Sequence, residues 1–594
     1  MENVEIASAL NRMADLLEIQ DANPFRVRAY RNAVRTVENQ TRPMAELCAE
    51  GFDLTELPGI GEDICGYIHE LVNTGEIAQL AELEGTLPGS IAELLRIEGL
   101  GPKRVRLLHD RLNICSLDDL DRALRNGKLE GLKGFGPKTI ERIGSALGEP
   151  SLKVTRFRWI DAQQFVEPLL AHLRAAPGIE RVEAAGSYRR HTETVGDIDL
   201  LAICAKPAAV MKHFLAFPDV ARTIAHGSTR GTIVLHSGLH VDLRILPKRC
   251  YGAAMHYFTG SKAHNIAVRK LGVERGLRIS EYGVFRLGER GGARRIGGQT
   301  EEDVFQSVGM DWVPPELRED QGEIEAALAH ELPALIEVAD IRGDLQMHTD
   351  WTDGTATAEA MIRGCRARGY RYCAITDHSQ AVAVTGGLEP RDLARQWKEL
   401  ARVARAVRGI RVLRSMEVDI RADGTLDLPD SWLERLDLVV VSVHSNMGMS
   451  RTKMTDRVLR AIEHPSVDIL GHPTGRLINQ RPAYEIDIEE ILQAAARLDV
   501  AVELNAQPER LDLADVLVRR ARDLGVRIAI NSDAHSVESL RYMELGVAQA
   551  RRGWLTAADV INTWPLARLQ KWLARRSTTR VRKPRRAART TSSG

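Results

Sequence analysis

The stretch AAGSYRRHTETVGDIDLLAI, from Ala184 to Ile203, decides how the front half of this chain folds. It places Asp197 and Asp199 two residues apart at the head of an apolar run. Because side chains alternate between the two faces of a strand, this spacing puts both carboxylates on one face. A surface Asp-x-Asp turn is the alternative interpretation, and Gly186-Ser187, eleven residues before Asp197, disfavours it.

A second segment, LHVDLRIL, alternates like a strand and carries Asp242. A neighbouring strand could bring this third carboxylate to the first two, and three converging carboxylates repel one another unless cations lie between them. Two Mg²⁺ or Mn²⁺ ions would neutralise them, activate a 3′-hydroxyl and steady a leaving pyrophosphate. The segment GSYRR, Gly186 to Arg190, is a glycine turn with a hydroxyl and guanidinium groups, which suits a triphosphate at the start of a helix.

Three segments in the first 145 residues share a different pattern, an apolar residue followed by Gly-apolar-Gly and a helical run. They are LPGIGEDICGYI from Leu57, IEGLGPKRVRLL from Ile97 and LKGFGPKTIERI from Leu132. A single copy is typical of an ordinary turn between helices. Three copies favour helix-hairpin-helix modules, whose backbone N–H groups hold DNA phosphates without reading bases. The glycines expected at the DNA backbone are Gly59, Gly61, Gly99, Gly101, Gly134 and Gly136.

Gly186-Ser187 followed by Gly196-Asp197-Ile198-Asp199 resembles the nucleotidyltransferase signature. MHYFTGSKAHNIAVR, Met255 to Arg269, is similar to the nucleotide-selecting segment of family X DNA polymerases, and the whole resemblance spans roughly residues 1–315. It implies that Asp197, Asp199 and Asp242 bind the catalytic metals. The other residues that it implies contact the incoming nucleotide or the nascent pair are Gly186, Ser187, Arg190, Gly196, Tyr257, Phe258, Gly260, Asn265 and Arg269.

Within that set, Ser187, Arg190 and Gly196 would contact the triphosphate, while Tyr257, Phe258 and Gly260 would line the sugar pocket and exclude a 2′-hydroxyl. Asn265 and Arg269 would reach minor-groove edges of the nascent pair and template. Tyr257 and Phe258 could instead be core aromatics, but YFTGS pairs them with a turn rather than with a helical stripe.

One departure from this resemblance concerns lyase chemistry. In lyase-proficient relatives the helix after the first hairpin carries lysines, one of which forms a Schiff base with an abasic sugar. GEDICGYIHE offers Asp63 and Tyr67 instead, and a Schiff base needs an amine. We therefore expect weak or absent lyase activity, which borohydride trapping on an incised abasic site would test.

The last part of the chain contains seven apolar runs, and six of them end in potential metal ligands. These are DLQMH (His348), YCAITDH (His378), RVLRSMEVD (Glu417), DLVVVSVHS (His444), VDILGHP (His472) and RIAINSDAH (Asp533, His535); the seventh, VAVELNA, ends in Glu503 and Asn505. Strands alternating with amphipathic helices predict a parallel barrel, whose functional groups gather at the C-terminal ends of the strands. The mixture of imidazole and carboxylate suits Mn²⁺ or Zn²⁺ clusters that hydrolyse phosphate esters.

The order of these motifs resembles the polymerase and histidinol phosphatase (PHP) domain, and its place behind a family X polymerase resembles the bacterial PolX architecture. The resemblance implies up to three metal ions and a 3′ to 5′ exonuclease, and it leaves open 3′-phosphatase or abasic-endonuclease action. The implied ligands are Gln346, His348, Asp353, His378, Glu417, His444, His472, Asp533 and His535. Gln346 offers only a neutral amide oxygen, so one ion should bind less tightly, with Mn²⁺ favoured over Zn²⁺.

Composition agrees with a multi-domain cytoplasmic protein. The 594 residues exceed one hydrophobic core, and 44% hydrophobic with 27% charged residues is a globular balance. No run of about 18 apolar residues could cross a bilayer, MENVEIASALNRMADLL is not a signal peptide, and seven scattered cysteines support neither disulfides nor a zinc ribbon. The acid-free tail from Arg575 should be disordered, either as a solubilising tail or as a phosphate-binding arm.

We therefore predict a multi-domain α+β and α/β chain. Its expected parts are a helical DNA-binding domain (1–85), a helix-hairpin-helix subdomain (86–152), a nucleotidyltransferase palm with a mixed sheet (153–250), a thumb-like nucleotide-selecting subdomain (251–315), a linker (316–338), a distorted (β/α)7 PHP barrel (339–574) and a basic tail (575–594). The predicted function is a monomeric DNA-directed DNA polymerase for short gap filling in repair, acting on gapped or nicked DNA with dNTPs, with an exonuclease that processes 3′ ends. The alternatives are a non-DNA nucleotidyltransferase with a fused metabolite phosphatase, or a DNA-end binding scaffold with an inactive barrel.

Overall fold

The computed structural model describes residues 3–38, 40, 44–87, 91, 94, 100–129, 132, 134–136, 139–140, 143, 156–288, 293–382 and 385–574. The chain divides into two compact units, Met1–Thr155 and Arg156–Gly594. Gly99 and the basic tail, residues 575–594, lie outside the described residues.

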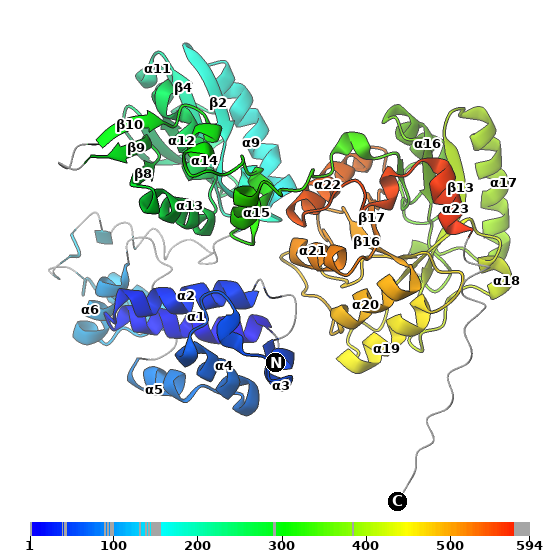
Figure 1. Ribbon diagram of the computed structural model, residues 1–594, viewed down its shortest axis with the longest axis horizontal. Coiled ribbons are helices and arrows are strands. Elements are labelled where there is room, and N and C mark those ends of the chain that lie inside the picture. Colours follow the sequence, from blue (N-terminus) through cyan, green and yellow to red (C-terminus); the bar gives the residue numbers. More distant parts are fainter. Residues whose placement is uncertain are drawn as a thin grey trace, which may run out of the picture. The chain divides into compact units, whose positions relative to one another are not determined.

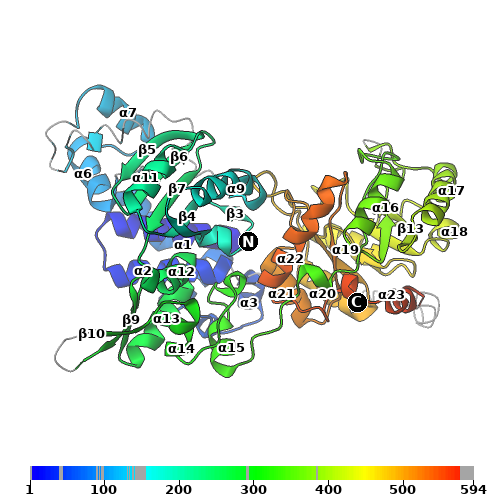
Figure 2. The same ribbon diagram turned by 90° about the horizontal axis from the view of Figure 1, so that it is seen from above.

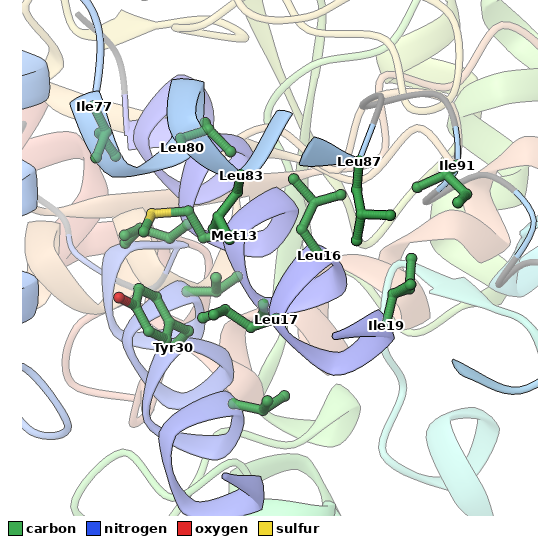
Figure 3. Close-up of a cluster of buried hydrophobic side chains, with 14 of the residues drawn as sticks. Met13, Leu16, Leu17, Ile19, Tyr30, Ile77, Leu80, Leu83, Leu87 and Ile91 are labelled. Carbon is green, nitrogen blue, oxygen red and sulfur yellow. The ribbon is translucent and has the colours of Figure 1, made fainter. Parts of the chain in front are cut away.

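The first unit is helical. Its described elements are α1 (Asn3–Ile19), α2 (Pro24–Glu38), α3 (Met44–Ala49), η1 (Leu54–Glu56), α4 (Glu62–Thr74), α5 (Ala78–Thr86), α6 (Pro102–Leu112) and α7 (Leu117–Arg125). Met13 and Leu17 recur at helical spacing on α1 and are buried, and they meet Leu80 and Leu83 of α5 and Tyr30 of α2 (Figure 3). This shared apolar face holds the helical unit together.

The glycine pairs lie at the turns that the sequence predicts. Gly61 is the N-cap of α4 and Gly101 is the N-cap of α6. Gly59 and Gly134 have φ of +80° and +94°, a region that favours glycine. A Cβ on Gly59 would also lie 3.1 Å from the Cβ of Asn32. Gly61 and Gly101, each the second glycine of its motif, therefore start helices. The first backbone N–H groups of each helix are left for an acceptor outside the helix.

The second unit begins with a mixed five-stranded sheet of order β2-β4-β7-β6-β5. Its strands are β2 (Ile179–Ala184), β4 (Asp197–Cys204), β5 (Val220–His226), β6 (Arg230–Leu235) and β7 (His240–Ile245), and the short strands β1 (Phe157–Arg158) and β3 (Thr194–Val195) pair beside it. β4 and β7 are parallel, whereas β2, β5 and β6 join antiparallel. The predicted mixed palm sheet is confirmed.

The two faces of this sheet bury different side chains. Helices α9 (Trp159–Arg174) and α11 (Pro207–Leu215) lie beside this sheet (Figure 2). Their apolar side chains belong to one buried cluster with Ile198, Leu200 and Val241. Helix α12 (Tyr251–Thr259) packs against Leu201 and Ile203, the alternate positions of β4. Because alternate residues share a face, Asp197, Asp199 and Asp242 all lie on the face that α12 partly covers.

After α12 the chain forms a small thumb region. It contains α13 (Lys262–Glu274), β8 (Leu277–Ser280), β9 (Gly283–Leu287), β10 (Ala293–Gly297), α14 (Glu301–Ser307), η4 (Pro315–Leu317) and α15 (Glu323–Ala329), followed by η5 (Val338–Asp340). Tyr257 and Phe258 lie in the last turn of α12, and the turn begins only at Gly260. The sequence argument that set these aromatics in a turn rather than on a helix was wrong, because the helix continues to the residue before the glycine.

The seven predicted apolar runs form seven parallel strands paired in chain order. They are β11 (Gly343–Asp344), β12 (Tyr372–Ile375), β13 (Arg411–Asp419), β14 (Leu438–Ser442), β15 (Ile469–Leu470), β16 (Ala501–Asn505) and β17 (Ile528–Asn531). A parallel bridge between Met347 and Ala534 joins the two ends of the sheet. The predicted barrel, nearly closed, is confirmed.

Helices surround these strands (Figure 1). They are α16 (Ala358–Ala367), α17 (Pro390–Ala406), α18 (Asp430–Leu433), α19 (Arg451–Ile462), α20 (Ile488–Leu498), α21 (Asp515–Asp523), η7 (Glu538–Tyr542), α22 (Met543–Arg552), η8 (Ile561–Thr563) and α23 (Leu566–Leu573). Inside the barrel, Leu413 and Val440 belong to one buried cluster with Trp564, Leu569 and Trp572. The last helix therefore helps to fill the barrel core.

Candidate active sites

The palm strands bring the three predicted carboxylates together. Asp199 of β4 is the direct register partner of Asp242 on β7, and Asp197 lies two residues before Asp199 on the same face. Asp242 accepts a hydrogen bond from the hydroxyl of Thr232, and guanidinium nitrogens of Arg230 and Arg244 each lie 3.7 Å from it. The sheet thus presents three carboxylates at one end of two neighbouring strands.

The electrostatics of this group favour a bound cation. Burial, together with the charges of Asp197 and Asp242, raises the pKa of Asp199 to about 7. Arg244 and Arg190 oppose that shift without cancelling it. A set of oxygen ligands that repel one another in this way fits hard divalent ions such as Mg²⁺ and Mn²⁺.

Gly186–Arg189 form the short helix α10, directly beside the carboxylates. Gly186 has φ of +63°, and a Cβ there would lie 3.1 Å from Oδ2 of Asp199. Only glycine lets the backbone pass this close to the acid without strain. Ser187 is half-buried in α10, and Gly196 lies between β3 and β4 just before Asp197.

The predicted nucleotide-selecting residues line the end of α12 and the start of α13. Arg244 stacks over the Phe258 ring at 4.4 Å, and the Tyr257 and Phe258 rings meet edge to face at 5.1 Å. Asn265 is buried, and its amide donates to the Tyr257 carbonyl at 2.6 Å. Arg269 is exposed on α13. In this structure Asn265 therefore supports the α12 end rather than pointing freely outward.

The second group of ligands lies at the C-terminal rim of the barrel and centres on Glu417. Its carboxylate lies 3.5 Å from Nε2 of His348, 3.3 Å from Nδ1 of His378, 3.5 Å from Nε2 of His444 and 3.2 Å from Nε2 of His472. Nε2 of His348 also lies 3.0 Å from Oδ1 of Asp533. One buried carboxylate is thus shared by four imidazoles.

A neighbouring part of the rim centres on Asp353. Its Oδ2 lies 3.4 Å from Nε2 of His378 and 3.4 Å from Nε2 of His535, and its Oδ1 lies 3.7 Å from Nδ1 of His348. Two compact sets of ligand atoms result among the described residues, one of His348, Asp353, His378 and His535 and another of His378, Glu417 and His444. His378 belongs to both sets.

These contacts are close but poorly aligned for hydrogen bonds. Within the part of the chain that the structure describes, both ring nitrogens of His348, Nδ1 of His378 and Oε1 of Glu417 are buried without a hydrogen-bond partner, although carboxylate or imidazole atoms lie nearby. Nε2 of His444 and Nε2 of His472 face each other at 3.2 Å. Lone pairs that converge in this way fit divalent metal ions. Gln346 is fully buried beside them, and neither the nitrogen nor the oxygen of its amide has a hydrogen-bond partner among the described residues.

Opposite charges dominate the electrostatics of the rim. Although burial disfavours the charged ring, Glu417 and Asp419 raise the pKa of His444 to about 9. Burial likewise opposes the charge on His535, but Asp353 and Asp533 raise its pKa to about 9. Against the same opposing burial, the histidines hold the pKa of Asp353 well below its usual range.

Several rim residues that sequence reasoning did not assign hold the ligands in place. Oδ1 of Asp419 lies 3.1 Å from Nδ1 of His444, which leaves Nε2 facing Glu417. Asn505 donates to Oδ2 of Asp533 at 3.0 Å, and Glu503 accepts from the backbone N–H of His472 at 2.7 Å. Such partners orient metal ligands. The available signal was that Asp419 and Asn505 end strands, as several ligands do, and that Glu503 lies two residues before Asn505 in the same strand.

Asp377 supports the rim loop that carries Asp353. It accepts from the backbone N–H of Thr349 at 2.7 Å, from the hydroxyls of Thr349 and Thr352 at 2.6 and 2.7 Å, and from Gln396 at 2.6 Å. Its position next to His378 in the sequence gave no sign of this role, because its partners lie on a different loop and helix.

Comparison with known proteins assigns this combination of sites. Four family models match the chain. Residues 1–77 match the model described as a helix-hairpin-helix domain, and residues 91–149 match a SAM-like helix-hairpin-helix tandem. Residues 254–319 match the DNA polymerase beta thumb, and residues 344–507 match the PHP domain. A curated protein of Bacillus subtilis, DNA polymerase/3′-5′ exonuclease PolX, is 36% identical over 577 residues, which cover 97% of this chain and 100% of that protein. The chain belongs to the PolX family.

Other relatives of this PolX family member match a smaller share of it. A probable phosphatase of Aeromonas salmonicida is 32% identical over 204 residues, covering 32% of this chain and 77% of that protein. Probable phosphatase YcdX of Shigella dysenteriae is 29% identical over 213 residues, which cover 34% of this chain and 81% of that protein. The full-length match and the thumb match do not favour the alternatives of a metabolite-directed nucleotidyltransferase or an inactive scaffold.

Membership of the PolX family also indicates what kinds of ligand the chain binds. The helix-hairpin-helix and thumb segments imply that the chain binds DNA, and the polymerase and PHP parts imply dependence on divalent metal ions. Among the described residues, no helix is both long and apolar enough to span a membrane.

Proposed function

We propose that this chain is a DNA-directed DNA polymerase that fills short gaps during repair, with a 3′ to 5′ exonuclease in its barrel. The observation that carries the polymerase half is the register of Asp199 against Asp242 on parallel strands, with Asp197 on the same face and Gly186 against Asp199. The substrates are gapped or nicked DNA and dNTPs.

In the palm, Asp197, Asp199 and Asp242 would hold two Mg²⁺ or Mn²⁺ ions. When bound, the ions supply charge neutralisation for the triphosphate and acidify the attacking 3′-hydroxyl. The residues of the chain do the rest. Ser187, Arg190 and the backbone at Gly186 and Gly196 bind the triphosphate, and the end of α12 forms the sugar pocket. Asn265 and Arg269 stand beside the nascent pair.

The sugar pocket is formed by Tyr257, Phe258 and Gly260. Their rings and backbone would exclude a 2′-hydroxyl by bulk. The stacking of Arg244 on Phe258 at 4.4 Å and the hydrogen bond from Asn265 to the Tyr257 carbonyl at 2.6 Å support this wall. Such support keeps the reacting atoms in register.

The N-terminal unit holds the DNA backbone, and its lyase activity is weak or absent. Gly61 and Gly101 begin α4 and α6, and together with Gly59, Gly134 and Gly136 of the same motifs they would present backbone N–H groups to phosphates. No lysine precedes Lys103 in the sequence, so no lysine side chain of that region can form a Schiff base. Tyr67, on α4, stacks on Tyr30 with ring centroids 6.3 Å apart.

In the barrel, the rim ligands would hold up to three Mn²⁺ or Zn²⁺ ions. When bound, they supply Lewis acidity toward a phosphodiester and activate the attacking water. Glu417 bridges the histidines, Asp353 joins His378 to His535, and Asp419 and Asn505 fix the orientation of His444 and Asp533. The ninth ligand, Gln346, contributes a weaker oxygen donor.

The two activities act on the same 3′ end, so a shared chain raises the effective concentration of the end at the second site. We propose that the chain works as a monomer. We also propose the domain limits given above, 1–85, 86–152, 153–250, 251–315, 316–338, 339–574 and 575–594.

A primer assay tests both halves together. A 5′-labelled primer on template is incubated with Mn²⁺, with or without dNTPs, and wild type is compared with Asp197→Ala and His348→Ala. We expect wild type and Asp197→Ala to shorten the primer without dNTPs, and only wild type and His348→Ala to extend it with dNTPs. Shortening by His348→Ala, or extension by Asp197→Ala, would refute the assignment of the corresponding site.

A further inference from the structure

The barrel touches the palm at the segment that joins α10 to β3, residues 190–193. Arg552, the last residue of α22, is largely buried there. Its Nη1 donates to Oε1 of Glu319 at 3.0 Å and to the backbone carbonyl of Arg190 at 3.0 Å. Its Nε donates to Oδ2 of Asp515 at 2.8 Å. Both carboxylates keep this buried guanidinium charged, because burial alone would disfavour the charge.

Glu319 connects this arginine of the barrel to an arginine of the palm. The same oxygen, Oε1 of Glu319, accepts from Nε of Arg190 at 3.0 Å. Nη1 of Arg190 donates to the Thr259 carbonyl at 2.5 Å, and a Cβ on Gly260 would lie only 3.2 Å from it. Nε and Nη1 of the Arg190 guanidinium are thus both held by protein atoms.

The fixed guanidinium stands within electrostatic reach of the palm acids. Arg190 is one of the two arginines whose charge lowers the pKa of Asp199, against the larger effects that raise it. A second contact with the barrel holds the same segment at Glu193, whose carboxylate accepts from Arg476 at 3.1 Å and from Gln549 at 2.7 Å. Residues 190 and 193 are therefore both held from the barrel side.

We propose that Arg552 of the barrel is a positioning residue for nucleotide addition, because it fixes Glu319 and, through Glu319, the guanidinium of Arg190. This inference rests on the proposed role of Arg190 in triphosphate binding. Glu319 shared between two arginines cannot swing toward the acids or carry Arg190 away from them. Without Arg552, Glu319 has a single arginine partner, and the pair can rotate together about the Arg190 side chain.

Single-nucleotide addition measured against dNTP concentration tests the proposal. We expect Arg552→Gln and Glu319→Ala each to raise KM for the dNTP roughly tenfold with little change in kcat, since misplacement of a positioning group by about 1 Å is costly. Arg552→Lys, which can reach Glu319 but not all three partners, should fall between wild type and Arg552→Gln. The rate of primer shortening should stay at the wild-type value.

The matched control is Arg551→Gln. Arg551 is the neighbouring arginine on α22 and makes its own buried contacts, to Glu316 at 2.7 Å and to the Ile336 carbonyl at 3.0 Å, without contacting Arg190 or Glu319 in the described structure. We expect its dNTP KM to match wild type. An equal rise of KM in Arg551→Gln and Arg552→Gln would mean general loosening of this junction and would overturn the proposal.

The remaining outcomes separate this inference from the proposed function. If wild type adds no nucleotide to a primer, the proposed function itself fails. If Arg190→Ala raises KM but Arg552→Gln and Glu319→Ala do not, the positioning role of Arg552 alone is wrong. Should Arg552→Gln fail to fold because Asp515 is left buried, Glu319→Ala carries the test, and an unchanged KM in that variant refutes the proposal. Fluorescence titration of dNTP onto a dideoxy-terminated primer complex gives the same comparison without turnover.

Discussion

The palm and the barrel both gather carboxylates, but they balance their charges in opposite ways. In the palm, Asp197, Asp199 and Asp242 face one another and the pKa of Asp199 rises to about 7. In the barrel, Glu417 and Asp353 are surrounded by imidazoles, and the pKa of His444 and of His535 rises to about 9 instead. We therefore expect the palm to hold its cations weakly until a substrate brings further negative charge, and the barrel, whose ligands must lose protons to bind an ion, to hold them more firmly.

The largest expected effect is loss of the resident metals in Glu417→Gln. Glu417 lies within 3.5 Å of four histidines, so the change removes the shared negative charge with almost no change of shape. We expect primer shortening to fall by at least about 100-fold, because loss of even outer partners of metal ligands costs 10–100-fold. Metal content after dialysis, measured by elemental analysis, should fall with it.

Extension by Glu417→Gln should match wild type, and the exposed Glu434→Gln is the matched control for both measurements. Retention of all ions by Glu417→Gln would show that the barrel does not depend on its central carboxylate, and the contrast with the palm would be lost.

The second effect distinguishes the palm. Asp199→Asn should abolish extension and yet stabilise the fold in chelator at pH 8. A carboxyl whose pKa is about 7 when folded and near 4 when unfolded binds more protons in the folded state between those values, so its charge lowers the unfolding free energy as pH rises from 4 to 7. In Asp199→Asn the unfolding free energy should rise by about 1–3 kcal/mol, which is less than the full pKa shift would give because solvent screens the charge.

Thermal unfolding at pH 5 and pH 8 measures this gain, which should be larger at pH 8. If the melting temperature of Asp199→Asn at pH 8 is equal to or lower than that of the wild type, the inferred repulsion between the palm carboxylates is wrong.

The third effect is a difference in how the two sites take up metal with pH. His444 and His535 must lose protons to bind an ion, so affinity in the barrel should keep rising up to about pH 9. Affinity in the palm should level off above about pH 7, once Asp199 is ionised. Mn²⁺ titration of Asp197→Ala reports the barrel, and titration of His348→Ala reports the palm. If Mn²⁺ affinity depends on pH in the same way at both sites, the proposed electrostatic difference between palm and barrel is wrong.

The smallest expected effect is in Gln346→His. Its amide is buried and without hydrogen-bond partners among the described residues, so an imidazole there can become a ligand. We expect one ion to be retained more tightly after dialysis, with a shift of preference from Mn²⁺ toward Zn²⁺. Gln346→Ala is the control and should show no such gain. Equal metal content in wild type and Gln346→His would mean that this position does not face an ion.

The sequence predicted those parts of the two sites that follow from local patterns along the chain. Strand periodicity set Asp197 and Asp199 on one face, and parallel strands in chain order brought their C-terminal ends, with His348, His444 and Asp533, to one rim. These placements follow from a period of two along a strand and from the direction of βα units. Neither needs knowledge of distant contacts.

The sequence could not predict the contacts that orient those residues. Arg552 is separated from Arg190 by 362 positions and from Glu319 by 233, and no periodic pattern marks such an ion pair. Asp419 looked like the end of a strand and proved to hold His444. The aromatics of YFTGS were placed in a turn because the glycine that ends a helix and the glycine of a turn look alike in sequence.

The bridge between Met347 and Ala534 has a consequence for the order in which the chain is made. The barrel ligands come from both ends of the domain, so the cluster cannot assemble until residue 535 has left the ribosome, whereas the palm carboxylates are complete at residue 242. Because domains tend to fold as they emerge, N-terminal part first, a prematurely terminated translation product would carry a full set of polymerase acids and no nuclease. During synthesis of each molecule, the polymerase carboxylates are therefore in place before the nuclease ligands are.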